Sequence, residues 1–164
     1  MHRAFIQAEG DAYRLSTTVL RSAVERSATL RDRCLRYLEM LMVQTSQAAA
    51  CNARHNPPER LARWLLMVRD RIDSDDLPMT QEFLSVMLGV RRSGVSVAAS
   101  TLQAGGLIQL SRGHVTITDH DGLAAAACDC YRLIEQSRWR ILGRPSDGRS
   151  SNIARVAAGP RRKR

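Results

Sequence analysis

The sequence has 164 residues, of which 44% are hydrophobic and only 4% aromatic, and its net charge is +9. A core of Leu, Val, Ile, Met and Ala favours packed helices over a β-sandwich, and no apolar run reaches the roughly 18 residues of a membrane span. Residues 143–164 carry seven basic side chains and one acidic side chain, so +6 of the charge lies there and only +3 on the rest.

The N-terminal segment contains two short mixed runs, 4–6 and 12–15, on either side of Glu9-Gly10-Asp11. This pattern predicts one or two short strands around a turn. It lacks the apolar stretch of a signal peptide, so we expect a cytoplasmic location. Ser16 then begins a run of hydroxyl side chains that predicts the N-cap of a helix over 19–26, and Ser27 or Thr29 is suited to cap the next helix.

The next predicted helix is long, about 30–54. Apolar or small residues recur along it at spacings of 3, 4, 3 and 4, namely Leu35, Leu38, Met42, Thr45 and Ala49. A second apolar edge flanks this seam, formed by Leu30, Cys34, Tyr37 and Leu41. Such a helix must bury both edges. It is therefore either a core helix of a single chain, or one edge packs in the core while the other pairs with a second copy.

A proline pair separates this helix from a shorter one. His55-Asn56-Pro57-Pro58 ends the long helix, and Asn56 can cap the next one with a proline in its first turn. That helix is expected over 59–72, with Leu61, Leu65 and Val68 on one face and Trp64 beside them. Residues 73–78 are polar and predict a break.

Residues 80–102 have the pattern of a helix-turn-helix. Thr80 is a suitable N-cap, and Gly89 stands where the turn between the helices requires a positive φ. Ser85 is small enough for close approach of the two helices, while Val95 and Leu102 are apolar anchors on the second one. Each feature is common alone, but their joint spacing predicts this motif.

The second helix of the motif is predicted to expose a polar face, formed by Arg91, Arg92, Ser93, Ser96 and Ser100. Arginine can bind both guanine O6 and N7, and small hydroxyl side chains allow close approach to bases or phosphates. This face is typical of a recognition helix in the DNA major groove. The simpler interpretation of the two arginines is a solvated surface pair.

A short hairpin follows the predicted recognition helix. Residues 107–111 and 114–118 alternate as strands around Arg112-Gly113, which predicts a wing with Arg112 placed to contact a phosphate. Asp119 or Asp121 is expected to cap one last helix that continues through 123–134. The fold class predicted is mostly α with a small β-hairpin wing: a winged helix-turn-helix preceded by a long helix.

The cysteines and histidines show no local ligand motif. The four cysteines, Cys34, Cys51, Cys128 and Cys130, form neither a CxxC nor a CxxxC pair, and the four histidines, His2, His55, His114 and His120, form no metal-ligand pattern. We expect reduced thiols in apolar packing and no metal or cofactor, with a metal or redox role as the alternative. Without a phosphate loop or nucleophile motif, an enzyme is not expected.

Three segments give the chain a resemblance to a known family. They are Glu59-Arg60-Leu61-Ala62-Arg63-Trp64-Leu65-Leu66, the pattern Thr80-x-Glu82 through Leu88-Gly89-Val90-Arg91-Arg92, and Gly106-Leu107-Ile108 through Gly113-x-Val115-x-Ile117-x-Asp119. Over 28–135 the chain resembles the C-terminal part of bacterial Crp/Fnr-family transcription regulators. The resemblance implies that the long helix forms a homodimer coiled coil through the seam Leu35, Leu38, Met42, Thr45 and Ala49. It also implies that the bound dimer recruits or blocks RNA polymerase.

The resemblance assigns roles within the motif. Arg92 matches the family's guanine-reading arginine, and Thr80 and Gln81 match positions near the DNA backbone. Ser93 stands where many members have a base-reading glutamate, and Val97 where some have a second base-reading arginine. These departures imply a different half-site, in which Val97 can contact a thymine methyl. Arg91 occupies a position that is often serine and adds a phosphate or base contact.

The N-terminal part departs further from the family, whose members carry a β-roll sensor there. Fewer than thirty residues precede the long helix here, so we expect no cyclic nucleotide, haem or iron–sulfur cluster to bind. The predicted domains are 1–27, a remnant of the sensor; 28–55, the dimerisation helix; 56–140, the winged helix-turn-helix; and 141–164, a disordered basic tail.

The function predicted is a sequence-specific transcriptional regulator that binds double-stranded DNA as a homodimer. The alternative is a dimerising or decoy protein that pairs with full-length relatives without specific DNA binding. Ser93, Val97 and the missing sensor keep this alternative open.

Overall fold

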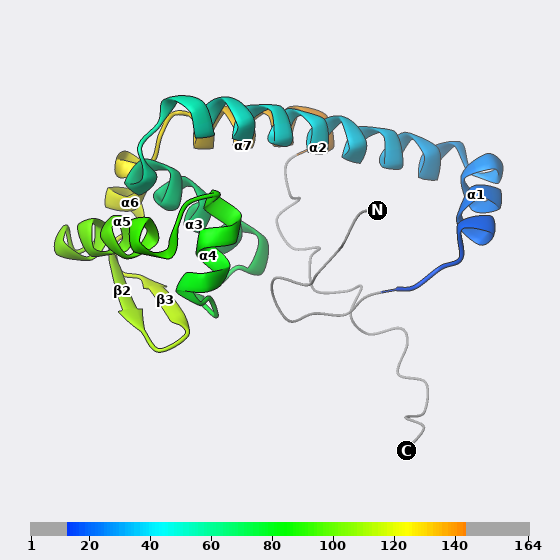
Figure 1. Ribbon diagram of the computed structural model, residues 1–164. Coiled ribbons are helices and arrows are strands. Elements are labelled where there is room, and N and C mark those ends of the chain that lie inside the picture. Colours follow the sequence, from blue (N-terminus) through cyan, green and yellow to red (C-terminus); the bar gives the residue numbers. More distant parts are fainter. Residues whose placement is uncertain (1–12, 144–164) are drawn as a thin grey trace, which may run out of the picture.

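The computed structural model describes residues 13–143, and within them the chain forms seven helices and three short strands. The elements are α1 (Thr17–Arg26), α2 (Ala28–Arg54), α3 (Pro57–Ile72), β1 (Asp76–Leu77), α4 (Gln81–Leu88), α5 (Arg92–Ala104), β2 (Ile108–Ser111), β3 (His114–Ile117), α6 (His120–Ala126) and α7 (Cys130–Leu142). Helix α2 is a long rod, with α1 at one end and the compact group of α3 to α6 and the strands at the other (Figure 1). The predicted mostly helical fold with a small hairpin is confirmed.

Helix ends follow the capping signals of the sequence. The hydroxyl groups of Ser16 and Ser27 accept hydrogen bonds from the first turns of α1 and α2, as predicted. Asn56 Oδ1 accepts from Glu59 N at 3.0 Å and caps α3, directly after His55 ends α2. Tyr13 to Leu15 lie in neither helix nor strand, so the strand expected over 12–15 is absent there. The rest of that segment and residues 144–164 lie outside the described residues, whereas Ile141 and Leu142, which the sequence predicts to lie in the disordered tail, belong to α7.

The main core lies among α3, α4, α5, α6 and the strands. Helix α3 runs through its centre, with Leu61 and Leu65 fully buried, because its apolar face is covered by α5 on one side and α6 on the other. The other fully buried large side chains of this core are Leu66, Leu77, Leu84, Leu88, Val95, Val115 and Leu123. Burial of this many aliphatic side chains gives the compact group a stable core of its own.

The sheet has three antiparallel strands in the order β1-β3-β2. The hairpin of β2 and β3 matches the prediction, but β1 was missed because residues 73–77 are polar except for one leucine and a proline follows. That leucine, Leu77, pairs with Val115 and both are buried, so β1 ties the segment before α4 to the wing.

The last predicted helix is in fact two helices, and the prediction of a single one was wrong. Helix α6 ends at Ala126, and α7 begins at Cys130 after a short break. Their apolar residues face different partners, since Leu123 belongs to the main core whereas Ile134 packs against α2. Helix α7 then runs antiparallel to α2, so that Arg36 contacts the end of α7 through the Ile141 carbonyl.

Helix α2 packs on α7 by an edge that the sequence did not identify. Met40 and Val43 lie against Ile134 and Ile141, with Met67 of α3 completing this second apolar cluster. The expected internal edge included Tyr37 and Leu41, but both are exposed. No helix in residues 13–143 is long and apolar enough to cross a membrane.

Candidate nucleic-acid interface

The turn between α4 and α5 has the geometry that its sequence predicts. Thr80 Oγ1 accepts a hydrogen bond from Phe83 N at 3.1 Å and starts α4. Gly89 ends it with φ of 61°, a left-handed conformation in which a side chain would be strained. The N–H of Val90 then bonds back to the Ser85 carbonyl at 3.2 Å, which closes the turn before α5 begins.

A buried arginine fastens this turn to the core, which the sequence analysis did not anticipate. Arg60 of α3 is only 7% exposed and donates a hydrogen bond to the carbonyl of Leu88, the last residue of α4. A guanidinium at this place offsets the negative end of the α4 dipole and satisfies a carbonyl that the helix leaves free. Arg60 therefore helps to set the angle at which α5 leaves the turn.

Helix α5 has one buried face and one exposed face. Val95, Ala98, Ala99 and Leu102 pack into the core. The opposite face exposes Arg92, Ser93, Val97 and Ser100, with Arg91 immediately before the helix. Val97 is 66% exposed, although it is apolar, and nothing in the described chain covers it. This face combines a positive start with short side chains along its length.

Two of the predicted DNA contacts bind each other. Ser96 Oγ donates to Gln81 Oε1 at 3.1 Å, so this bond connects the second helix of the motif to the first turn of α4. Ser96 is half-buried rather than fully outward as expected. The pair therefore braces α4 against α5 in the free protein.

The wing stands beside the start of α4. Gly113 adopts φ of 80° in the hairpin turn, and Arg112 before it is exposed. A groove runs between the N-terminal end of α4, the start of α5 and this hairpin, and its lining includes Thr80, Arg92 and Arg112. The one carboxylate in the lining is Glu82. Two arginines from different elements thus line one groove, and arginine is a common partner of DNA phosphates and bases.

A recognition helix held by a tight turn and flanked by a two-stranded wing defines a winged helix-turn-helix, a class of DNA-binding domain. Residues 59–126 match the family model described as the Crp-like helix-turn-helix domain. This part of the chain is therefore similar to the Crp-like helix-turn-helix domain.

The fold also resembles a solved structure. A protein from Eubacterium rectale assigned to the Crp/Fnr family of transcriptional regulators superposes with a TM-score of 0.52 at 21% sequence identity. The match covers 66% of this chain and 50% of that one, so the chain corresponds to about half the length of that protein. No curated protein sequence matches the chain.

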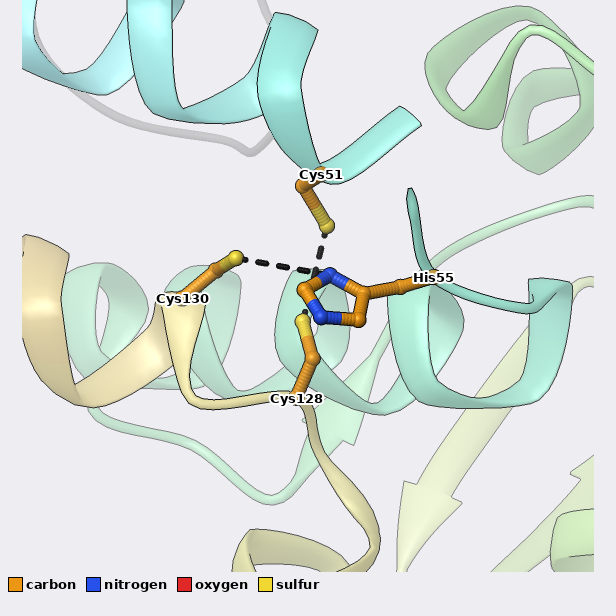
Figure 2. Close-up of side chains that lie close together, drawn as sticks. All are labelled: Cys51, His55, Cys128 and Cys130. Carbon is orange, nitrogen blue, oxygen red and sulfur yellow. Dashed lines mark hydrogen bonds between the residues drawn. The ribbon is translucent and has the colours of Figure 1, made fainter. Parts of the chain in front are cut away.

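The structure also brings together a group of cysteine and histidine side chains that the sequence did not predict to be neighbours. Cys51, His55, Cys128 and Cys130 lie together at the junction of α2, α3 and α7 (Figure 2). Burial and the neighbouring thiols raise the pKa of Cys128 to about 12. Local spacing did not reveal this cluster, because it forms only when α7 folds back along α2. Cys34, the remaining cysteine, lies apart from it on α2 and is half-buried.

Proposed function

We propose that this chain is a sequence-specific transcriptional regulator that binds double-stranded DNA as a homodimer, with α5 in the major groove. The observation that carries the proposal is the exposed face of α5, which begins with two arginines and lies beside an arginine-bearing wing in a Crp-like domain. The residues assigned to DNA are Thr80, Gln81, Arg91, Arg92, Ser93, Ser96, Val97 and Arg112.

The arginines have different roles in this proposal. Arg92 lies at the first position of α5, so its guanidinium is placed to bind guanine O6 and N7. Arg112 is at the tip of the wing, where it meets a phosphate and contributes affinity without sequence preference. Arg91 adds positive charge beside the helix start, and Thr80 lies near the backbone.

The short side chains determine which bases can be read. Ser93 and Ser100 are exposed and short, and they allow the helix axis to approach the base edges closely. Val97 offers only a methyl surface, which suits the C5-methyl of thymine. Since Ser96 and Gln81 are already paired, this bond must open or be shared for either group to reach DNA.

The seam of α2 supports the homodimer. Leu35, Leu38 and Met42 are 59%, 53% and 71% exposed, and Thr45 and Ala49 continue the same line. The opposite side of α2 packs on α7, so this seam has no cover within residues 13–143. A parallel pair of such helices would bury both seams and set two copies of α5 about one DNA turn, ~34 Å, apart on a near-palindromic site. Recruitment or exclusion of RNA polymerase would then follow from where that site lies.

Selection of binding sites from random duplex DNA tests the proposal. We expect an enriched near-palindrome that binds far more tightly than scrambled DNA at the same salt concentration. If no sequence is enriched and affinity falls with salt equally for all DNA, only charge is recognised. The chain would then act by pairing with relatives through α2 rather than by reading DNA.

Arginine variants separate base reading from phosphate binding. Arg92→Ala should weaken binding to the selected site by about 1–3 kcal/mol and relax the preference for guanine. Arg112→Ala should instead weaken binding to every sequence equally and reduce the slope of log affinity against log salt concentration by about 1. Arg140→Ala, an exposed arginine on α7, is the matched control and should leave both properties unchanged. Equal losses on selected and scrambled DNA for Arg92→Ala would contradict its assigned role.

A further inference from the structure

Three cysteines and a histidine from distant parts of the sequence converge on one point (Figure 2). Cys51 lies in the last turn of α2, and His55 is the residue that ends this helix. Cys128 lies in the break between α6 and α7, and Cys130 is the first residue of α7. Each offers one potential ligand atom, and the four atoms all lie within 4.8 Å of one another.

The distances suit a single ion. Cys51 Sγ lies 3.5 Å from Cys128 Sγ, and Cys130 Sγ lies 3.5 Å from His55 Nδ1. In a tetrahedral zinc site with Zn–S bonds of about 2.3 Å and Zn–N bonds of about 2.0 Å, neighbouring ligand atoms are roughly 3.5–3.8 Å apart. A polynuclear iron–sulfur cluster would hold its thiolates further apart than one ion does.

The burial of the group points the same way. Cys51, Cys128 and Cys130 are 0%, 7% and 3% exposed and form a buried cluster of their own, separate from the two aliphatic clusters. His55 is half-buried and closes one side of the group. Apolar packing needs neither three adjacent thiols nor an imidazole, whereas a structural zinc site needs this donor set.

The surroundings of Cys130 suit a metal ligand. Gln47 Nε2 donates to Cys130 Sγ at 3.0 Å, which is the kind of hydrogen bond that stabilises a metal-bound thiolate. Cys130 is also the first residue of α7, where the helix dipole favours a negative charge. Neither feature is required if the thiol only fills space.

We propose that Cys51, His55, Cys128 and Cys130 bind one Zn²⁺ ion in a closed tetrahedral Cys₃His site. With all four positions taken by protein ligands, the ion has a structural role, and its binding releases the thiol protons. It connects the end of α2 to the α6–α7 break and to the first residue of α7. The site therefore stabilises the junction at which the long helix meets the DNA-binding domain, a role independent of DNA recognition.

Metal content of the purified chain is the first test. Untagged full-length protein, prepared under reducing conditions and dialysed against metal-free buffer, should contain one zinc per chain by elemental analysis. Cys51→Ser, Cys128→Ser, Cys130→Ser and His55→Ala should each lose most of it. Cys34→Ser and His120→Ala are matched controls outside the cluster and should keep one zinc per chain.

Cobalt substitution reports on the ligands directly, even where a serine variant fails to fold. The unmodified chain loaded with Co²⁺ should show thiolate-to-metal charge transfer and tetrahedral d–d bands, both abolished by added Zn²⁺. His55→Cys should keep the ion but shift the spectrum from three sulfurs and one nitrogen to four sulfurs. Gln47→Ala should weaken the affinity by about 10–100-fold, whereas Gln44→Ala, which alters a side chain bonded to Arg71, should not.

Other results would overturn the proposal. They are a folded chain without zinc and without cobalt charge transfer, or retention of zinc by the ligand variants. A Cys51–Cys128 disulfide in metal-free protein, found by peptide mapping after thiol blocking, would assign a redox role to the cluster instead.

Discussion

The regions at the two ends of α2 differ in how far their apolar side chains are buried. Beyond its C-terminal end, the core of α3 to α6 buries Leu61, Leu65 and Leu84 almost completely, and only Val86 and Val97 of its large apolar side chains are well exposed. In contrast, most of the exposed large apolar side chains lie on residues 13–42. The first region completes its core with its own chain. The second has the pattern of an amphipathic helix with an uncovered apolar edge, which we propose pairs with a second copy.

Matched leucine substitutions in the two regions should test this difference in burial most clearly. Leu65→Ala removes a fully buried side chain from the main core and should lower the free energy of unfolding by about 2–5 kcal/mol. Leu38→Ala makes the same chemical change on the exposed seam and should alter the free energy of unfolding by no more than about 0.5 kcal/mol in dilute, monomeric protein. Urea unfolding followed by circular dichroism measures both. Comparable losses at the two positions would mean that the seam is already buried in the monomer.

A charge on the seam should have the next largest effect. Met42→Glu places a carboxylate in the proposed dimer interface and should weaken self-association by at least about tenfold, since an unpaired charge is costly to bury. Arg33→Glu introduces the same group on α2, and in the heptad frame of the seam position 33 faces away from it. Sedimentation equilibrium on both variants measures the dissociation constant. If both weaken association alike, long-range charge rather than the seam controls pairing.

Local signals in the sequence predicted much of the winged domain. The caps at Thr80 and Asp119, the positive φ of Gly89 and the hairpin at Arg112-Gly113 are each decided by residues a few positions apart. For this reason they could be inferred without knowledge of the tertiary fold. The exposed face of α5 followed from helical periodicity in the same way.

The rest depended on contacts between distant segments. Strand β1 is only two residues long and exists because Leu77 reaches Val115. The break before α7 arises because that helix leaves the main core for α2. Because α7 folds back along α2, it determines which edge of α2 is packed and brings the cluster around Cys51 together. No local spacing in the sequence encodes this long-range contact.

Two N-cap substitutions give the smallest and most discriminating test of the contrast. Asp119 accepts from Gly122 N at 2.9 Å and caps α6, whose Leu123 is fully buried in the core, so Asp119→Ala should cost about 1 kcal/mol of global stability. Ser16 caps α1 in the same manner, but α1 buries no residue. Ser16→Ala should therefore fray α1 locally while leaving global unfolding unchanged within about 0.5 kcal/mol.

Hydrogen exchange distinguishes these outcomes, because local fraying speeds exchange in α1 alone, whereas global destabilisation speeds it throughout the core. The concentration of the protein then becomes informative. If Ser16→Ala is neutral in dilute protein but destabilises concentrated protein, α1 must be packed in the dimer as well as α2. The pairing surface would then extend beyond the seam to the exposed side chains of Val19 and Leu20, which the monomer leaves in solvent.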